Sequence, residues 1–155
     1  MVIFANICYL RRGNRVLLQR KAAGLFGEGK WNGPGGKAKR GESPQDAAVR
    51  EMFEETGFRV KGLRFHGLLN FYVKKELDQV VFIFSTTHAS GRLVRSDEGE
   101  LGWFPVDAIP YSDMWSDDPF WLPLMIEGKS FVCDFYYTRK YGRMTKHLVR
   151  SVNAK

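Results

Sequence analysis

The 155-residue sequence is poor in cysteine and has no long apolar run. Its two cysteines, Cys8 and Cys133, each lie in an apolar, strand-like segment, so we expect buried thiols rather than a disulfide or a zinc site. No segment approaches the roughly 18 apolar residues of a transmembrane helix. The N-terminus lacks a basic segment followed by a small-residue cleavage site, so we expect no signal peptide. These absences favour a cytoplasmic protein with no membrane partner.

The sequence also lacks a charge excess outside its C-terminal segment. The net charge of +7 comes mostly from the residues after Tyr137, where six residues are basic and none is acidic. We expect either a solvated basic hairpin or a segment that attracts an anionic substrate or RNA. The six basic residues are Arg139, Lys140, Arg143, Lys146, Arg150 and Lys155.

The length and the 44% hydrophobic content predict one domain, residues 1–155, with a single core. We expect this domain to act as a monomer. Alternating or apolar runs predict strands at 2–10, from 16, 63–73, 79–87, 101–104, 131–137 and 144–152. Residues 21–36 are predicted to form a glycine-rich loop, and helices are predicted at 44–56 and from 116 to about 127. This order predicts a mixed α+β fold, a mixed sheet with helices packed on its faces.

The helix at 44–56 has clear boundary signals. Ser43 is a typical N-cap residue, Pro44 suits the first helical position, and Gly57 suits the C′ position. The apolar side chains recur at helical spacing, which predicts one face packed on the core. That core face is predicted to consist of Val49, Met52, Phe53 and Thr56.

A second stripe of the same helix carries Glu51, Glu54 and Glu55. Carboxylates at this spacing repel one another, and we see no basic partner at matching spacing, so a cation is expected to neutralise them. Clustered oxygen ligands suit Mg²⁺ or Mn²⁺. Arg50 is adjacent and is expected to orient a glutamate or to meet a phosphate. The alternative is a solvated acidic face.

Two features before the helix favour the metal interpretation. Gly35 and Gly36 allow close approach of the backbone to a ligand, and Glu42 adds another carboxylate. The complete pattern is Gly36-x5-Glu42-x7-Arg50-Glu51-x2-Glu54-Glu55-x-Gly57. This pattern resembles the Nudix box at every position, so the sequence is identified as a member of the Nudix hydrolases.

The resemblance implies a fold, a reaction and a set of ligands. The fold is an α/β/α sandwich, and the reaction is attack of water on a phosphate bridged by divalent metal. It implies that Glu51, Glu54 and Glu55 hold the metal and that Gly36 adds a backbone carbonyl. Metal ions lower the pKa of bound water and neutralise developing phosphate charge, which agrees with that assignment.

Beyond the box, residues 31–37 and 113–124 resemble the animal branch of Nudix enzymes that hydrolyse oxidised purine nucleoside triphosphates, the MutT homologues. This resemblance implies that Asn32 hydrogen-bonds the base, that Trp115 stacks on it, and that Asp117 and Asp118 read its edge. Matching positions add further candidates. Glu98 matches an acid near the metal, which would act either as the general base or as an additional metal ligand. The other candidates for substrate binding are Asn6, Lys21, Phe26 and Phe71.

Some positions depart from that branch. Asn6 stands where the animal enzymes have a threonine that faces the base, and Pro34 replaces an aromatic residue. An asparagine and a threonine both form hydrogen bonds, but their reach and donor geometry differ. The departures leave the preferred base open.

The acid pair Asp117-Asp118 also has its own physical interpretation. The pair lies among aromatic residues, so burial and mutual repulsion should raise at least one pKa. Two acids that share a proton both donate and accept, which suits a purine edge with a carbonyl and an N–H. The alternative is that Ser116 or Asp117 caps the following helix, and we expect such a cap to form as well.

The main functional hypothesis is therefore hydrolysis of oxidised purine nucleoside triphosphates, such as 8-oxo-dGTP or 2-oxo-dATP, to the monophosphate and pyrophosphate. A second hypothesis is another Nudix substrate: an RNA cap or 5′ end, a dinucleoside polyphosphate or ADP-ribose. The basic C-terminal segment favours RNA. A third is a non-catalytic nucleotide sensor, which the complete glutamate set argues against.

Overall fold

The computed structural model describes residues 1–152, which form a nine-stranded mixed sheet, a two-stranded sheet and two α-helices. The large sheet has the order β11-β10-β6-β7-β1-β2-β3, with β4 paired to β1 and β9 paired to β2. The pairs β1–β7 and β10–β6 are parallel and the other pairs are antiparallel. The elements are β1 (Ile3–Arg12), β2 (Arg15–Lys21), β3 (Trp31–Asn32), β4 (Gly35–Lys37), α1 (Pro44–Thr56), β5 (Phe58–Lys61), β6 (Arg64–Val73), β7 (Glu76–Thr86), β8 (His88–Gly91), β9 (Gly99–Pro105), the 3-10 helix η1 (Tyr111–Asp113), α2 (Asp118–Ile126), β10 (Ser130–Tyr137) and β11 (Met144–Val152).

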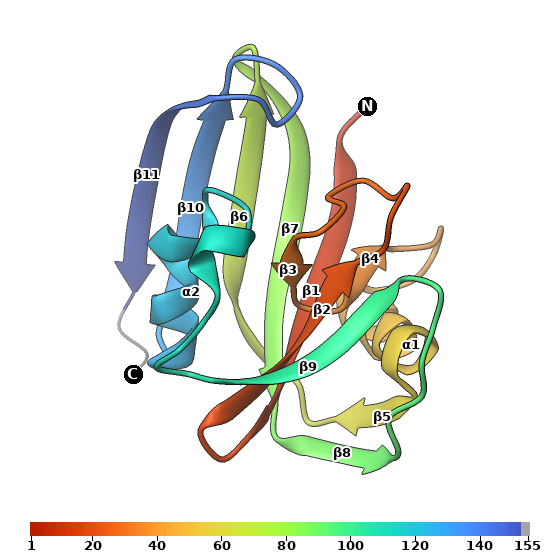
Figure 1. The fold of residues 1–155 in the computed structure, drawn as a ribbon. Coiled ribbons are helices and arrows are strands. Elements are labelled where there is room, and N and C mark those ends of the chain that lie inside the picture. Colours follow the sequence, from red (N-terminus) through yellow and green to blue (C-terminus); the bar gives the residue numbers. More distant parts are fainter. Residues whose placement is uncertain (153–155) are drawn as a thin grey trace.

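The two α-helices pack on opposite faces of the large sheet. Successive side chains of a strand point to opposite faces. On β1, Tyr9 belongs to the apolar cluster that contains α2, whereas Cys8 and Leu10 belong to the cluster that contains α1. Figure 1 shows α2 beside β10 and α1 beside β4 and β5. This arrangement confirms the expected α/β/α sandwich with a mixed sheet.

Helix α1 has the predicted boundaries and, except at Phe53, the predicted core face. The Ser43 hydroxyl accepts the N–H of Asp46, and Gly57 ends the helix in the left-handed region with φ 85°. Phe53, however, is 43% exposed and lies under the Arg59 guanidinium at 4.2 Å. The prediction for Phe53 is therefore wrong, because the buried stripe of α1 runs through Ala48, Met52 and Thr56, with Val49 packed against the same cluster.

Several short elements were not predicted. The segment at 21–36 contains β3 and the start of β4, and β5, β8 and η1 were missed. Two to four residues carry too little periodicity to indicate a strand. Both thiols are buried and free, as expected.

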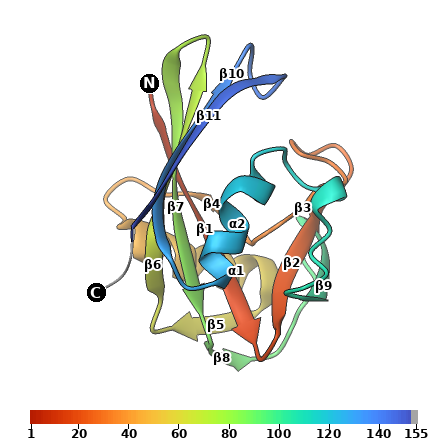
Figure 2. The ribbon, with the colours of Figure 1, turned by 90° about the vertical axis from the view of Figure 1, so that its left-hand side faces the viewer.

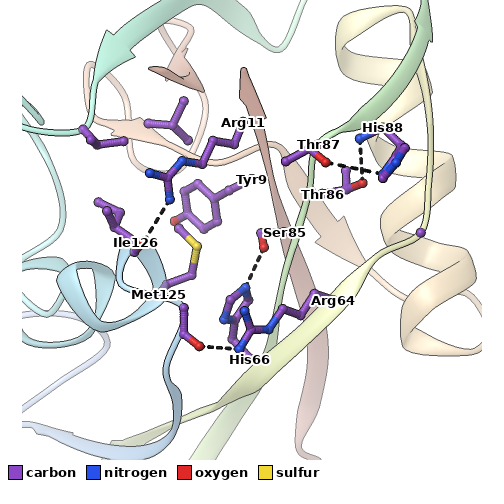
Figure 3. A pocket seen from close by; sticks show the side chains of 14 residues that line it. Tyr9, Arg11, Arg64, His66, Ser85, Thr86, Thr87, His88, Met125 and Ile126 are labelled. Carbon is purple, nitrogen blue, oxygen red and sulfur yellow. Dashed lines mark hydrogen bonds between the residues drawn. The ribbon is translucent and has the colours of Figure 1, made fainter. Parts of the chain in front are cut away.

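Side chains from β1 and β6 hold the carboxyl end of α2, where a cavity of about 280 Å³ opens (Figure 3). Arg11 Nη1 donates to the carbonyl of Ile126 at 2.8 Å, and Arg64 donates to that of Gly128. His66 contacts the next carbonyl along the chain at 3.2 Å. The first contact satisfies a carbonyl that the helix end leaves unpaired, and the other two hold the chain that follows the helix. They therefore hold α2 in place, and its other end carries Asp117 and Asp118.

The C-terminal segment is a hairpin rather than a free tail (Figure 2). Arg150 pairs with Asp134 at 3.1 Å, and the Lys146 ammonium lies 5.4 Å from the Tyr136 ring centroid. Lys155 lies outside the described residues. The basic residues of the turn itself are exposed, namely Arg139, Lys140 and Arg143.

Candidate active site

A cavity of about 630 Å³ lies between the N-terminal end of α2, β1, β7 and the loop that precedes α1. It brings together residues that are far apart in the sequence. Ten of the candidate residues named above line it: Asn6, Lys21, Phe26, Asn32, Gly36, Phe71, Glu98, Trp115, Asp117 and Asp118.

The two aspartates lie at a buried wall of this cavity. Asp117 accepts hydrogen bonds from Trp121 Nε1 at 2.9 Å and from the Tyr137 hydroxyl at 3.3 Å. Asp118 Oδ2 is buried and has no hydrogen-bond partner among residues 1–152. Burial raises the pKa of both carboxyls, and repulsion by Asp117 raises that of Asp118 further. Both effects favour the protonated form of the pair.

The expected side-chain cap of α2 does not form. Asp117 occupies the N-cap position, but its side chain accepts no hydrogen bond from the first turn of the helix. Its carboxylate is instead engaged by Trp121 and Tyr137. The Ser116 hydroxyl likewise lies 3.4 Å from the Tyr137 hydroxyl. The capping prediction is wrong because the side chains of Trp121, four residues further along, and of Tyr137 on β10 take the oxygens that a cap would use.

Two asparagines present further polar atoms. Asn32 Oδ1 accepts from the Gly33 N–H at 2.9 Å and from the Tyr9 hydroxyl at 3.3 Å, which leaves its amide nitrogen as a donor for a ligand. Asn6 Nδ2 donates to the Gly36 carbonyl at 3.0 Å. Asn6 Oδ1 is buried and has no partner within the part of the chain that the structure describes. A buried acceptor without a partner is costly, so a ligand N–H is its natural complement.

The rest of the cavity is aromatic. The Phe26 and Trp115 ring centroids lie 5.2 Å apart, and Phe71 lies further in. Tyr141, which sequence reasoning missed, contacts all three rings. The only signal for Tyr141 was an aromatic residue in a turn that is otherwise basic.

Arg50 forms ion pairs with three glutamates of α1 and of the loop that precedes it. Its Nε lies 2.8 Å from Glu42 Oε2, and its Nη1 lies 3.0 Å from Glu51 Oε1 and 3.1 Å from Glu54 Oε2. The prediction that the glutamate stripe has no basic partner is therefore wrong, since Arg50 and Glu54 are four residues apart on α1. Arg50 also keeps the pKa of Glu42 low, at about 2.

Glu55 is in a different environment. Its side chain is only 3% exposed, and it accepts the Gly35 N–H at 2.8 Å. Lys21 Nζ lies 3.9 Å from Glu55 and 3.3 Å from Glu98. Burial and, to a lesser extent, the Glu51 charge raise the pKa of Glu55 to about 8, although the Lys21 charge lowers it. The lysine therefore only partly neutralises this carboxyl.

The backbone at Gly36 is closely packed against the glutamates. A Cβ at this position would lie 2.7 Å from Glu51 Oε1, so only glycine leaves that carboxylate in place. The Gly36 carbonyl accepts from Asn6, which links the acidic cluster to the rest of the cavity.

Five carboxylates thus gather around two cationic side chains. Among residues 1–152, no three acidic, histidine or cysteine side chains stand together as a ready-made metal site. The donors are nonetheless hard oxygens with an excess of negative charge, which suits a divalent cation such as Mg²⁺.

The sequence comparisons identify the family. The NUDIX domain family matches residues 3–125, so the chain belongs to the Nudix hydrolases, whose members generally use a divalent metal ion. The oxidized purine nucleoside triphosphate hydrolase of Mus musculus is 38% identical over 141 residues, with 90% of this chain and 89% of the mouse protein covered. That of Danio rerio is 44% identical over 124 residues, 79% of each chain.

A solved structure confirms the fold. The MutT protein of Bacillus halodurans superposes with a TM-score of 0.84 at 25% identity, covering 95% of this chain and 97% of that one. None of the helices within residues 1–152 combines the length and the apolar character needed to cross a membrane.

Proposed function

We propose that the protein hydrolyses oxidised purine nucleoside triphosphates, such as 8-oxo-dGTP and 2-oxo-dATP, to the monophosphate and pyrophosphate. The observation that carries this proposal is a cavity lined at once by a buried aspartate pair and by Gly36, Lys21 and Glu98, which adjoin the acidic cluster of α1. The two relatives named as oxidized purine nucleoside triphosphate hydrolases support the same substrate class.

The acidic cluster is the proposed metal site. Its proposed ligands to Mg²⁺, or to Mn²⁺, are the Gly36 carbonyl, Glu51, Glu54, Glu55 and Glu98. When bound, such an ion lowers the pKa of a water molecule and neutralises charge on the phosphates. Arg50 holds Glu51 and Glu54 in place through its hydrogen bonds.

Lys21 is proposed to meet the phosphates. Its ammonium already lies at the edge of the cavity beside Glu55 and Glu98. A cation at this position attracts an anionic substrate and can be displaced from the glutamates by a metal ion.

The base is proposed to bind at the other end of the cavity. Trp115 supplies an aromatic face for stacking, with Phe26 and Phe71 as further walls. The protonated aspartate pair both donates and accepts hydrogen bonds, and the Asn32 amide nitrogen adds a donor. An oxidised guanine differs from guanine by a carbonyl and an N–H on its five-membered ring, which changes the pattern that these groups meet. Asn6 Oδ1 adds an acceptor that a base or sugar donor would satisfy.

The test is a panel of nucleotides with Mg²⁺ in which pyrophosphate release is followed. The panel contains 8-oxo-dGTP, 2-oxo-dATP, dGTP, dATP, ADP-ribose, a dinucleoside polyphosphate and a capped RNA. The proposal predicts the highest kcat/KM for an oxidised purine triphosphate and no turnover in EDTA. Faster hydrolysis of any of the other compounds would contradict it.

RNA is the second candidate substrate, because the exposed Arg139, Lys140 and Arg143 flank Tyr141 at the cavity. Such charges would attract a polyanion that extends beyond one nucleotide. The capped RNA in the panel separates this candidate from the first.

We further propose a single catalytic domain that acts as a monomer in the cytoplasm, where free thiols such as Cys8 persist.

A further inference from the structure

The turn between β10 and β11 sends one aromatic side chain inward. Arg139, Lys140 and Arg143 of this turn are exposed, but Tyr141 is half-buried and lines the large cavity. Its ring centroid lies 5.9 Å from that of Trp115, in an edge-to-face arrangement. Phe26 and Phe71 lie at similar distances, 5.8 Å and 5.7 Å. Tyr141 therefore belongs to the same aromatic wall as the residue proposed to stack on the base.

The backbone of Tyr141 is in an unfavourable conformation. Its φ is 54°, in the left-handed region that a bulky residue rarely adopts. A glycine would meet this requirement without strain. A non-glycine residue persists in such a conformation only where its surroundings over-determine it, and such residues cluster at ligand sites.

The Tyr141 hydroxyl is anchored on β7. It lies 3.0 Å from Asp78 Oδ2 and 2.8 Å from Gln79 Oε1, and Gln79 itself lines the cavity. Burial and the Asp78 charge keep the pKa of Tyr141 well above its usual value, so the hydroxyl remains a donor. Figure 1 shows the β10–β11 turn next to the β6–β7 turn, and Lys74 N–H donates to the Tyr137 carbonyl between them. The C-terminal hairpin is thus tied to the strands that carry the cavity.

We propose that Tyr141, held by Asp78 and Gln79, forms the outer wall of the base site and contacts the purine, so that the C-terminal hairpin helps to select the substrate. The inference rests on the proposed function, since it assigns a further residue to the same site. A ring in contact with Trp115 supplies apolar and edge-to-face contact to a base that stacks there. The strained backbone is then retained because the ring is needed in the cavity.

Two substitutions separate this role from a structural one. Tyr141→Gly removes the ring and relieves the left-handed strain, whereas Tyr141→Ala removes the ring and keeps the strain. Both variants should raise KM for 8-oxo-dGTP by about 5- to 30-fold, with kcat within about twofold of wild type, because loss of an aromatic contact weakens base binding. The glycine variant should melt at a higher temperature than the alanine variant.

Two further variants calibrate the effect. Tyr141→Phe keeps the ring but loses the hydroxyl anchor, so KM should rise only about 2- to 10-fold. Tyr136→Ala is the matched control. Tyr136 lies on the same hairpin but stacks on Tyr72 at 4.5 Å and is not among the residues that line the cavity, so its removal should leave KM unchanged.

Calorimetric titration with 8-oxo-dGMP provides a readout that does not depend on turnover. The dissociation constant should rise in Tyr141→Gly and Tyr141→Ala in parallel with KM. Wild-type KM and affinity in both variants, with wild-type activity on oxidised purines intact, would overturn this inference alone. A wild-type protein that hydrolyses no oxidised purine would overturn the proposed function, and the inference with it.

Discussion

Replacement of Glu55 by glutamine should stabilise the metal-free protein at neutral pH. The buried carboxyl titrates at about 8, whereas an ordinary glutamate titrates at 4.5. Between these two pH values the unfolded chain releases the proton and the folded chain keeps it. The free energy of unfolding therefore falls as the pH rises from about 4.5 to about 8.

The size of this effect follows from the shift. Each pKa unit corresponds to about 1.4 kcal/mol, and roughly 2.5 units of the window lie below pH 7. Ionisation of Glu55 in the unfolded chain therefore lowers the free energy of unfolding by ~3 kcal/mol at pH 7. Glutamine keeps the hydrogen bond from the Gly35 N–H and, like the protonated carboxyl, carries no charge beside Lys21. We therefore expect a net gain of ~1–3 kcal/mol, or roughly 2–10 °C in Tm for a domain of this size.

The assay is urea unfolding of wild type and Glu55→Gln in EDTA at several pH values from 4.5 to 8. The difference should be near zero at pH 4.5 and should grow towards pH 8. Glu54→Gln is the matched control, because the Glu54 side chain is half-exposed and bonded to Arg50. A glutamine variant at position 55 that is less stable by the same amount at every pH would refute the reasoning.

The remaining predictions concern α2 and the metal site. Arg11→Met should lower the free energy of unfolding by ~1–3 kcal/mol, measured by urea unfolding, because the Ile126 carbonyl loses its buried donor. Glu54→Gln should reduce kcat by at least about 100-fold with little change in Tm, as expected for a group that acts directly on the metal or water. A variant at position 54 with near-normal turnover would remove Glu54 from the proposed site.

The parts of the fold that the sequence predicted well have strong local signals. Helix α1 begins and ends where Ser43, Pro44 and Gly57 indicate, because capping residues act within one turn of the chain. The short strands β3, β5 and β8 have no such signal. They exist because the neighbouring strands offer them hydrogen-bond partners.

Side-chain roles were harder to predict where several hydrogen-bond partners compete for the same atoms. An aspartate directly before a helix is expected to cap its first turn with its side chain, but Trp121 and Tyr137 donate to the Asp117 oxygens instead. The spacing of Arg50 and Glu54 was visible in the sequence, yet the link from Arg50 to Glu42 depends on the loop that leads into α1.

Tyr141 lay beyond prediction from sequence. Its place in the cavity depends on the register of β10 and β11 and on the contact of their turn with β7. The sequence alone predicted the two flanking strands and a basic charge, but no position for the Tyr141 side chain. The candidate residues inside the cavity, by contrast, came from motif positions, and the structure brings them together.

The most direct test of the account is the ratio of kcat/KM for 8-oxo-dGTP to that for dGTP, measured in wild type and in Asp118→Asn. Asp118 Oδ2 is buried and without a partner among residues 1–152, and burial beside Asp117 raises the pKa of its carboxyl, which favours a proton that an amide would fix on nitrogen instead. A mismatched hydrogen bond in a buried site costs ~1–3 kcal/mol, or about 5- to 150-fold. The account predicts a wild-type preference for 8-oxo-dGTP that falls by such a factor in Asp118→Asn, mainly through KM. Equal wild-type rates for the two nucleotides, or an unchanged ratio in the variant, would contradict it.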